Sequence, residues 1–205
     1  MRTRGRLLAA GVALVAMTLG LVYPANAGEL SSVDSREDVR HYDLAEGIDS
    51  GLPGTVMPDH HDGDLRRYSV RYTEKRIRVV LKFRDLTRTE PVLTIQARFR
   101  WPGGGQLNYA EALITGGEGN RSGTARLTTP EPCTIEHRIS YQSNRARVSF
   151  PAGCFSSPRW VQFNSMVLTM DHETEPAYLY VDDVFPVFGA DEGAYERFTR
   201  RIRRS

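Results

Sequence analysis

An alternating stretch near the middle of the chain constrains the fold more than any other feature. Apolar and polar side chains alternate from residue 67 to 72 and again from 77 to 84, with a polar break at residues 73–75. Successive side chains on a strand point to opposite faces, so each half is typical of a strand with one apolar face and one face rich in arginine. The pattern predicts a long antiparallel hairpin at the centre of an all-β domain.

The same alternation recurs along the chain, separated by glycine-rich turns. With no long helix in the pattern, roughly seven to nine strands indicate an antiparallel two-sheet sandwich of the jelly-roll or Ig-like kind, and a closed barrel is the alternative. An irregular or 3₁₀ turn is expected at 151–158. Further strands are expected at 38–43, 93–101, 107–115, 125–127, 135–141, 145–150, 160–169 and 178–184, the last of them at a sheet edge.

The first 27 residues have the three parts of a secretory signal peptide. Three arginines precede an apolar run from Leu7 to Val22, and a small-x-small cleavage sequence ends at Ala27. The apolar run is shorter than the roughly 20 residues that span a bilayer, so an uncleaved membrane anchor is the less favoured alternative. We expect a secreted protein, extracellular or associated with the cell wall. Its expected parts are a signal peptide at 1–27, a β-sandwich domain at 28–190 and a basic tail or short helix at 191–205.

The excess of basic over acidic residues in the full chain comes from this leader. The whole chain has 27 Lys and Arg against 25 Asp and Glu, and loss of the three leader arginines leaves 24 against 25. A nearly neutral domain has no overall electrostatic attraction for polyanions, although local basic patches remain possible. We therefore expect no nucleic-acid partner, and no stable membrane insertion once the leader is removed.

The two cysteines, Cys133 and Cys154, flank the hairpin expected at 135–150. An exported chain meets an oxidising environment, so we expect them to form a disulfide bond. The ends of antiparallel neighbours come within disulfide reach, and closing a loop of about 20 residues would stabilise the fold by roughly 3 kcal/mol. A catalytic or metal-binding thiol is the alternative.

The densest group of potential metal ligands precedes the central hairpin. Asp59, His61, Asp62 and Asp64 offer carboxylates that suit calcium and an imidazole that suits zinc or copper. We take calcium as the candidate ion, with Asp182-Asp183 able to approach from another strand. The alternative is a polar turn in which Asp62 or Asp64 accepts hydrogen bonds from nearby backbone amides.

A stripe of basic side chains follows the polar faces of the expected strands. If the strands pair in order, several of these side chains line one exposed face, where guanidinium groups pair bidentately with phosphate or carboxylate groups of cell-envelope polymers. We expect Arg78, Lys82, Arg98 and Arg100 to bind such a polymer. The alternative is a solvated outer face that discourages aggregation. The full stripe comprises Arg67, Arg71, Arg76, Arg78, Lys82, Arg84, Arg98, Arg100, Arg138 and Arg147.

Several short motifs occur in order along the mature chain. They are the spacing of Asp34 and Asp38, then Gly63-Asp64-Leu65, Arg78-Val79-Val80, Phe83-Arg84-Asp85-Leu86, the two cysteines, and Pro158-Arg159-Trp160-Val161. This order resembles a group of uncharacterised secreted β-sandwich proteins of actinobacteria, from about Asp34 to Asp183. That group has no assigned activity, so the resemblance implies no functional residue. More loosely, Gly63-Asp64 entering a strand is similar to the opening of carbohydrate-binding family 9 and DOMON sandwiches, which bind sugars or haem.

The sequence contains none of the common catalytic motifs: it has no Gly-x-Ser-x-Gly elbow, His-Glu-x-x-His, phosphate loop or dinucleotide fingerprint. The leading hypothesis is a secreted, non-catalytic β-sandwich protein with a structural role at the cell envelope or a binding role there, toward anionic cell-wall polymers or carbohydrate. Two alternatives stay open: a secreted hydrolase with paired carboxylates, which needs no local motif, and a calcium-binding structural module. Sugar stacking would use aromatic rings, and the candidates are Trp101, Tyr109, Trp160, Tyr178 and Tyr180.

Overall fold

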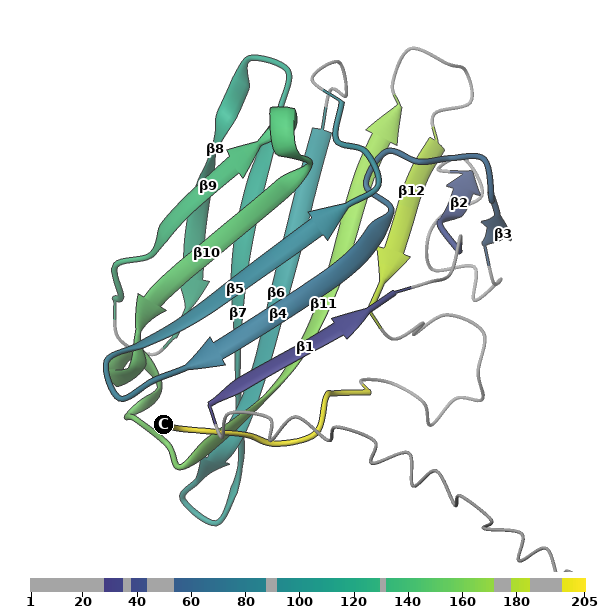
Figure 1. Cartoon of the computed structure of the whole chain (residues 1–205). Coiled ribbons are helices and arrows are strands. Elements are labelled where there is room, and N and C mark those ends of the chain that lie inside the picture. The colour runs from purple at the N-terminus through teal and green to yellow at the C-terminus, as the bar shows by residue number, and fades with distance from the viewer. Residues whose placement is uncertain are drawn as a thin grey trace, which may run out of the picture.

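The chain folds into two antiparallel β-sheets that pack face to face (Figure 1). The computed structural model describes residues 28–34, 38–43, 54–87, 92–129, 132–171, 178–184 and 197–205. The predicted signal peptide and its cleavage site at Ala27 lie outside the described residues. The two sheets have separate strand orders, which confirms the predicted sandwich and does not match a closed barrel.

The first sheet has five strands and contains the predicted central hairpin. β4 and β5 form that hairpin, with Tyr72 opposite Ile77 at its closed end and Leu65 opposite Phe83 at its open end. Thr73 closes the turn, because its backbone N–H donates to the carbonyl of Arg76 at 2.9 Å. In spatial order the strands are β1 (Glu29–Val33), β4 (Leu65–Tyr72), β5 (Arg76–Phe83), β10 (Arg145–Pro151) and β9 (Glu136–Ser140).

The second sheet has eight strands, and its centre is the pair of 12-residue strands β6 and β11. A two-residue turn joins β6 to β7, and both turn residues, Gly104 (φ +58°) and Gly105 (φ +82°), have the left-handed conformation that glycine adopts without steric cost. In spatial order the strands are β3 (Thr55–Val56), β2 (Arg40–Asp43), β12 (Tyr178–Asp183), β11 (Trp160–Asp171), β6 (Val92–Gly103), β7 (Gln106–Gly117) and β8 (Asn120–Thr128), and β13 (Ile202–Arg203) pairs with one end of β11.

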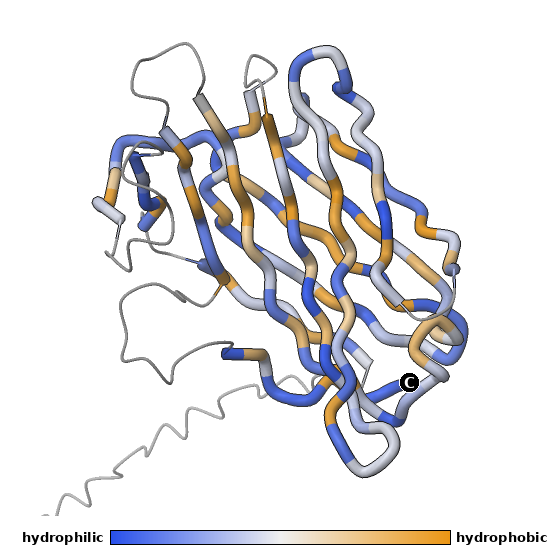
Figure 2. The backbone as a smooth tube through the Cα atoms, turned by 180° about the vertical axis from the view of Figure 1, so that it is seen from behind, coloured by the Kyte–Doolittle hydropathy of each residue, from blue (hydrophilic) through white to orange (hydrophobic). Residues whose placement is uncertain are grey.

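The core lies between the two sheets and is built from the apolar positions of the alternating pattern. In Figure 2, hydrophobic and hydrophilic segments alternate along the strands, as the period of two requires. Ile77 and Val79 of β5 are fully buried, and so are Phe99 of β6 and Phe163 of β11. The rings of Phe99 and Phe163 lie 5.5 Å apart, and Phe99 also meets Phe150 of β10 edge to face at 5.4 Å. These contacts join the two sheets.

The prediction that 178–184 is an edge strand is wrong. β12 lies between β11 and β2, because residues 40–43 pair with it along its outer side. β11, which the sequence predicts to be buried on both faces, is buried continuously from residue 163 to 167. The sheet therefore extends past β12 by two short strands taken from the N-terminal part of the chain.

A 3₁₀ turn and a disulfide bond close one end of the sandwich. The turn η3 (Ala152–Phe155) follows β10 directly, and a second 3₁₀ turn, η2 (Tyr141–Ser143), joins β9 to β10. Cys133 is bonded to Cys154 of η3, with a Cα–Cα distance of 5.9 Å. Both the predicted 3₁₀ turn at 151–158 and the predicted disulfide bond are confirmed.

The described part of the C-terminal segment, residues 197–205, is extended rather than helical. Ile202 is 3% exposed and pairs with Val161 at the end of β11. The backbone of Ser205 then bonds to Tyr72 and Glu74 of the other sheet, at 3.2 and 2.9 Å. The helical interpretation of this segment is therefore wrong within 197–205, because pairing with the first two residues of β11 gives backbone groups of this segment their partners.

Candidate functional site

The outer face of the five-stranded sheet carries the largest group of basic side chains among the described residues. The inward positions of its strands are apolar, so the alternation puts the basic positions on the opposite, outward face. Eight cationic side chains share this face with two carboxylates, those of Glu29 and Glu136. We call this surface the basic face, and its cations are Arg67, Arg71, Arg76, Arg78, Lys82, Arg138, Arg145 and Arg147.

The strand register places these cations directly opposite one another. Lys82 of β5 lies opposite Arg67 of β4 on one side and opposite Arg145 of β10 on the other, which makes a row of three cations across three strands. Arg147 faces Arg138 in the next row on this face, and Arg71 faces Arg78 in the row beyond it. Like charges directly opposite each other destabilise a sheet, so this arrangement is unfavourable for folding alone.

Most of the basic face has no counter-charge within the described part of the chain. Arg76 forms an ion pair with Glu136 at 2.8 Å, and its Nε donates to the Ser149 hydroxyl at 2.9 Å. The other seven cations are exposed and make no ion pair with a described residue. In Figure 1, which looks onto this sheet, no labelled element crosses the face. Their charges are therefore available to an external anion.

One corner of the basic face is hollowed. The hollow has a volume of about 200 Å³ and lies at the β9–η2–β10 hairpin. Its lining consists of three guanidinium groups and two hydroxyl groups, from Arg138, Ser140, Ser143, Arg145 and Arg147. The Ser143 hydroxyl donates to that of Ser140 at 2.8 Å, which keeps the two hydroxyl groups together. Every lining side chain is a hydrogen-bond donor, so the chemistry suits an anion.

The structure divides the four expected polymer-binding residues between two surfaces. Arg78 and Lys82 lie on the basic face, whereas Arg98 and Arg100 lie on β6, on the outer face of the eight-stranded sheet. Arg98 lies 3.7 Å from Glu111 as an ion pair and also donates to Gln96. Arg100 donates to Gln162 at 3.1 Å, and its guanidinium lies 4.3 Å from the ring centre of Phe198. These intramolecular contacts hold Arg98 and Arg100 in place.

The predicted metal ligands before the hairpin are arranged as a structured polar turn. Asp59 and His61 are exposed, and Asp62 and Asp64 are buried. The Asp62 carboxylate accepts a hydrogen bond from the backbone N–H of Thr87 at 2.6 Å. The Asp64 carboxylate pairs with Arg84 Nε at 2.9 Å. These bonds fasten the turn to the segment that follows β5.

Among the described residues, carboxylates converge elsewhere, at the open edge between the two sheets. Acidic oxygens of Asp34, Asp38 and Asp182 lie within 4.8 Å of one another. Asp34 follows β1, Asp38 precedes β2, and Asp182 points inward from β12. Asp182 also accepts a hydrogen bond from the backbone N–H of Leu65 in the opposite sheet. We call Asp34, Asp38 and Asp182 the acidic corner, and the chemistry of its oxygens is that of a calcium ligand set.

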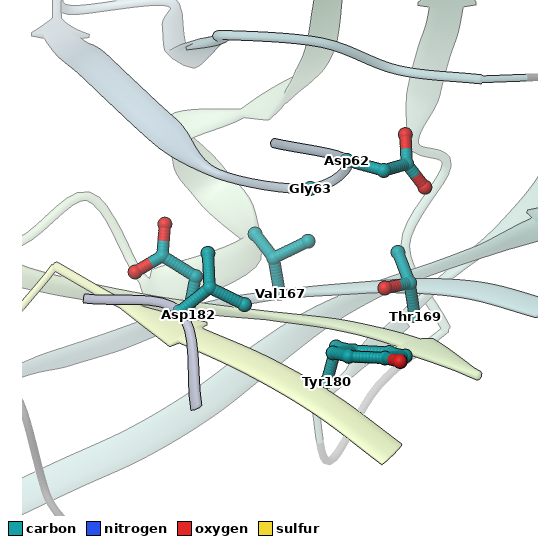
Figure 3. A pocket seen from close by; sticks show the side chains of 7 residues that line it. Asp62, Gly63, Val167, Thr169, Tyr180 and Asp182 are labelled. Atoms are coloured by element: carbon teal, nitrogen blue, oxygen red, sulfur yellow. The ribbon is translucent and has the colours of Figure 1, made fainter. Parts of the chain in front are cut away.

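Burial and neighbouring charges alter the protonation of this region. Burial raises the pKa of Asp182 to about 8, opposed by the Leu65 amide and reinforced by the carboxylates of Asp34, Asp38 and Asp64. Burial likewise raises the pKa of Asp62 to about 6. In Figure 3, Asp62 and Asp182 line one small cavity with Val167 and Thr169, but their carboxylates do not point toward each other. The cavity has no room for a water molecule.

Sequence reasoning missed some residues of both sites. Arg145 is absent from the predicted stripe, although it alternates with Arg147 on the same strand and the period of two was the available signal. Asp34 and Asp38 lie in a short motif of the sequence, and no local spacing connects them with Asp182. Strand pairing alone brings those three together.

Comparison with protein-family models, curated proteins and solved structures found no match to this chain. The resemblance to secreted actinobacterial sandwich proteins therefore stays a prediction. Within the described residues, no helix is long and apolar enough to cross a membrane. The disulfide bond is compatible with an extracellular protein.

Proposed function

We propose that this protein is a secreted, non-catalytic binder of anionic polymers of the cell envelope, and that the basic face is its binding surface. The observation that carries the proposal is the strand register, which collects eight cations and two carboxylates on one face of one sheet. The domain as a whole is close to neutral once the predicted leader is removed. The concentration of charge is therefore a property of this face and not of the composition.

The repulsion among the cations of the basic face supports the proposal that this face binds an external anion. Arg67, Lys82 and Arg145 stand in one row, and neighbouring strands lie about 4.8 Å apart, so each cation lies close to the next. Phosphate or carboxylate groups of a polymer would compensate these charges together. The arginines add directionality, because a guanidinium group donates two parallel hydrogen bonds to one phosphate or carboxylate.

The hollow at the β9–β10 hairpin supports phosphate groups in particular. Arg138 and Arg147 face each other across the two strands, and Arg145 faces Ser140 in the next row. A phosphate group has oxygens in several directions, which suits donors that converge from two strands. A carboxylate presents two oxygens in one plane and would satisfy fewer of these donors. We therefore favour a polyphosphodiester over a polyuronate.

Two other functions have less support. A hydrolase needs a cleft with two carboxylates about 5 to 10 Å apart, whereas the cavity beside Asp62 and Asp182 does not admit water. Sugar stacking on the outer surface needs exposed rings. Of the aromatic candidates, Trp101 is 6% exposed and Trp160 is covered by the Arg201 guanidinium, while Tyr109 is 45% exposed.

The proposal is tested by retention of the mature protein on immobilised poly(glycerol phosphate), with polygalacturonate and a neutral glucan as comparison matrices. We expect retention on the polyphosphate matrix at low salt, weaker retention on the polyuronate and none on the glucan. Added salt should elute the protein, because counterions screen and replace exposed charge contacts.

A matched pair of triple variants identifies the surface. Arg67→Gln, Lys82→Gln and Arg145→Gln together remove the central row, and we expect affinity to fall about tenfold to a hundredfold. The control replaces three exposed arginines outside the basic face, at 121, 126 and 159, with Gln. Both variants change the net charge by the same amount. Equal loss in the two variants, or no retention of the wild type at low salt, would refute the proposal.

A further inference from the structure

The hollow at the β9–η2–β10 hairpin concentrates positive charge more closely than the rest of the basic face does. Its three arginines, Arg138, Arg145 and Arg147, come from two neighbouring strands and line a volume of about 200 Å³. None of its lining residues is acidic. Glu136, two residues before Arg138 on β9, is already paired with Arg76 at 2.8 Å. Three positive charges therefore converge on a small space that is open to a ligand.

The hollow also lies at one end of the central row of cations. Across the strands this row runs from Arg67 through Lys82 to Arg145, and Ser140 of β9 follows opposite Arg145. β9 is the last strand in the order of this sheet (Figure 1), so the row ends at the hollow. A polymer that follows the row across the strands reaches the hollow at the end of its path.

The hairpin that carries the hollow is fastened to the neighbouring strand. The carbonyl of Asn144, the residue after η2, accepts the Phe83 N–H at 2.9 Å, and its side-chain amide donates to the carbonyl of Arg84 at 2.9 Å. The Ser140 hydroxyl accepts from that of Ser143 at 2.8 Å, which leaves the Ser140 hydrogen to donate to a ligand. Fixing a site in this way lowers the entropy lost when a ligand binds.

The donors of the hollow match a phosphomonoester better than a phosphodiester. A phosphomonoester presents three acceptor oxygens and carries a charge of about −1.5 to −2 at neutral pH. A diester inside a polymer has fewer free oxygens and less charge. Because each guanidinium group donates two parallel hydrogen bonds, three of them together with a serine hydroxyl offer more donors than a diester accepts. A monoester uses these donors and compensates more of the charge.

We propose that the hollow binds the terminal phosphate of the polymer, as a phosphomonoester, so that the protein recognises chain ends. This inference rests on the proposed function, in which the central row of cations holds the phosphodiester chain. With its end in the hollow, the chain has one direction on the basic face, from β9 across β10 and β5 to β4. A free phosphorylated small molecule has the same chemistry as a chain end, and the polymer experiment distinguishes the two sources.

The first experiment is a titration of the isotope-labelled mature protein, followed by amide chemical shifts, with methyl phosphate and dimethyl phosphate as probes at equal ionic strength and about pH 7.5. We expect saturable shifts at Arg138, Ser140, Ser143 and Arg147, and an affinity for methyl phosphate that is about tenfold higher or more, because charge-assisted hydrogen bonds are lost with the diester. Equal affinities, or shifts spread evenly over the basic face, would overturn the proposal.

The second experiment compares short poly(glycerol phosphate) chains before and after treatment with a phosphomonoesterase, which removes only the end phosphate. We expect the treated chains to bind about tenfold more weakly. If methyl phosphate is preferred but the treated chains bind as well as the untreated ones, the hollow takes a free small phosphate and the assignment to chain ends is wrong. Equal retention of both preparations would leave the proposed function intact, whereas no retention of either would refute that function itself.

A matched pair of double variants locates the binding of the end phosphate. Arg138→Gln with Arg147→Gln should weaken methyl phosphate binding about tenfold or more and remove the difference between the two polymer preparations. The control is Arg71→Gln with Arg78→Gln, at exposed positions on the same face outside the hollow, and it should change methyl phosphate affinity less than about twofold. Both variants change the net charge equally. Equal losses in the two would show a general attraction of charge and contradict a site in the hollow.

Discussion

Replacing Asp182 with Asn should make the protein more stable at alkaline pH. Asp182 is 5% exposed and lies close to the carboxylates of Asp34 and Asp38. Burial, with these charges, raises its pKa from 3.8 to about 8, so the folded protein holds this side chain protonated at neutral pH. Asn has the same shape as the protonated acid and keeps an oxygen that accepts the Leu65 N–H.

The size of the effect follows from the pKa shift. Because the folded state binds this proton more tightly than the unfolded chain does, its stabilising effect is complete below about pH 4 and is lost as pH rises toward 8. One proton changes the free energy of unfolding by about 1.4 kcal/mol per pH unit, so wild type should lose about 4 kcal/mol through Asp182 between pH 5 and pH 8. Asp62, whose pKa is raised to about 6, adds a smaller loss of unfolding free energy over the same pH range, and this loss is the same in wild type and variant.

The assay is denaturant unfolding of the mature protein at pH 5 and pH 8 in the presence of a chelator. The variant should be more stable than wild type by about 1.5 kcal/mol at pH 5, and this difference should grow by about 4 kcal/mol between pH 5 and pH 8. Asp59→Asn, at an exposed position, is the matched control and should follow wild type. A wild-type stability that does not fall between these pH values, or a variant that is weaker at pH 8, would refute the reasoning.

Calcium is tested in the same assay, because an ion would take the place of the proton at the acidic corner. If Asp34, Asp38 and Asp182 hold calcium, adding it at pH 8 will raise the wild-type midpoint by mass action, and Asp182→Asn will not show this gain. An unchanged wild-type midpoint would show that calcium does not bind at the acidic corner. Protonation of Asp182 would then be the reason that its carboxyl group tolerates burial.

Two further predictions concern the closed end of the sandwich. Replacing Cys133 and Cys154 with Ser opens a loop with a sequence separation of 21 and should lower the free energy of unfolding by about 3 kcal/mol, measured by denaturant unfolding against wild type under non-reducing conditions. Thr199→Val removes the hydroxyl that accepts the Phe163 N–H at 2.9 Å and should cost about 1 to 3 kcal/mol, whereas Thr199→Ser should keep most of the stability. Equal losses in the two Thr199 variants would contradict a role for that hydrogen bond.

Local periodicity was enough to predict most of the strands. In the 67–84 hairpin, the faces of Val70, Ile77 and Val79 follow from alternation alone, because one face of the sheet had to be buried. Periodicity gives the face of a strand but not its sheet. Arg98 therefore looked equivalent to Arg78, although β6 belongs to the opposite sheet.

The features that the sequence did not predict depend on pairing between distant segments. The acidic corner needs Asp34 and Asp182 side by side, and they are brought there only because β2 pairs with β12 and β1 with β4. The prediction of a helix in the C-terminal segment was wrong for a different reason. Phe198 and Ile202 are four residues apart, as in a helix, but the free end of β11 offered backbone partners and Ile202 became buried in a strand.

The basic face predicts a conflict between stability and binding, and Lys82 is the residue that tests it. Lys82 faces Arg67 and Arg145, and each opposed like-charge pair costs a few tenths of a kcal/mol up to about 1 kcal/mol. Lys82→Gln should therefore raise the melting temperature at low salt, lose that gain at high salt and weaken polyphosphate binding. Lys75→Gln, in the exposed turn between β4 and β5, is the control and should change neither quantity in this way. If Lys82→Gln destabilises the protein at low salt, the three cations of this row do not repel one another measurably. The repulsion would then give no support to the proposal that the basic face binds an external anion.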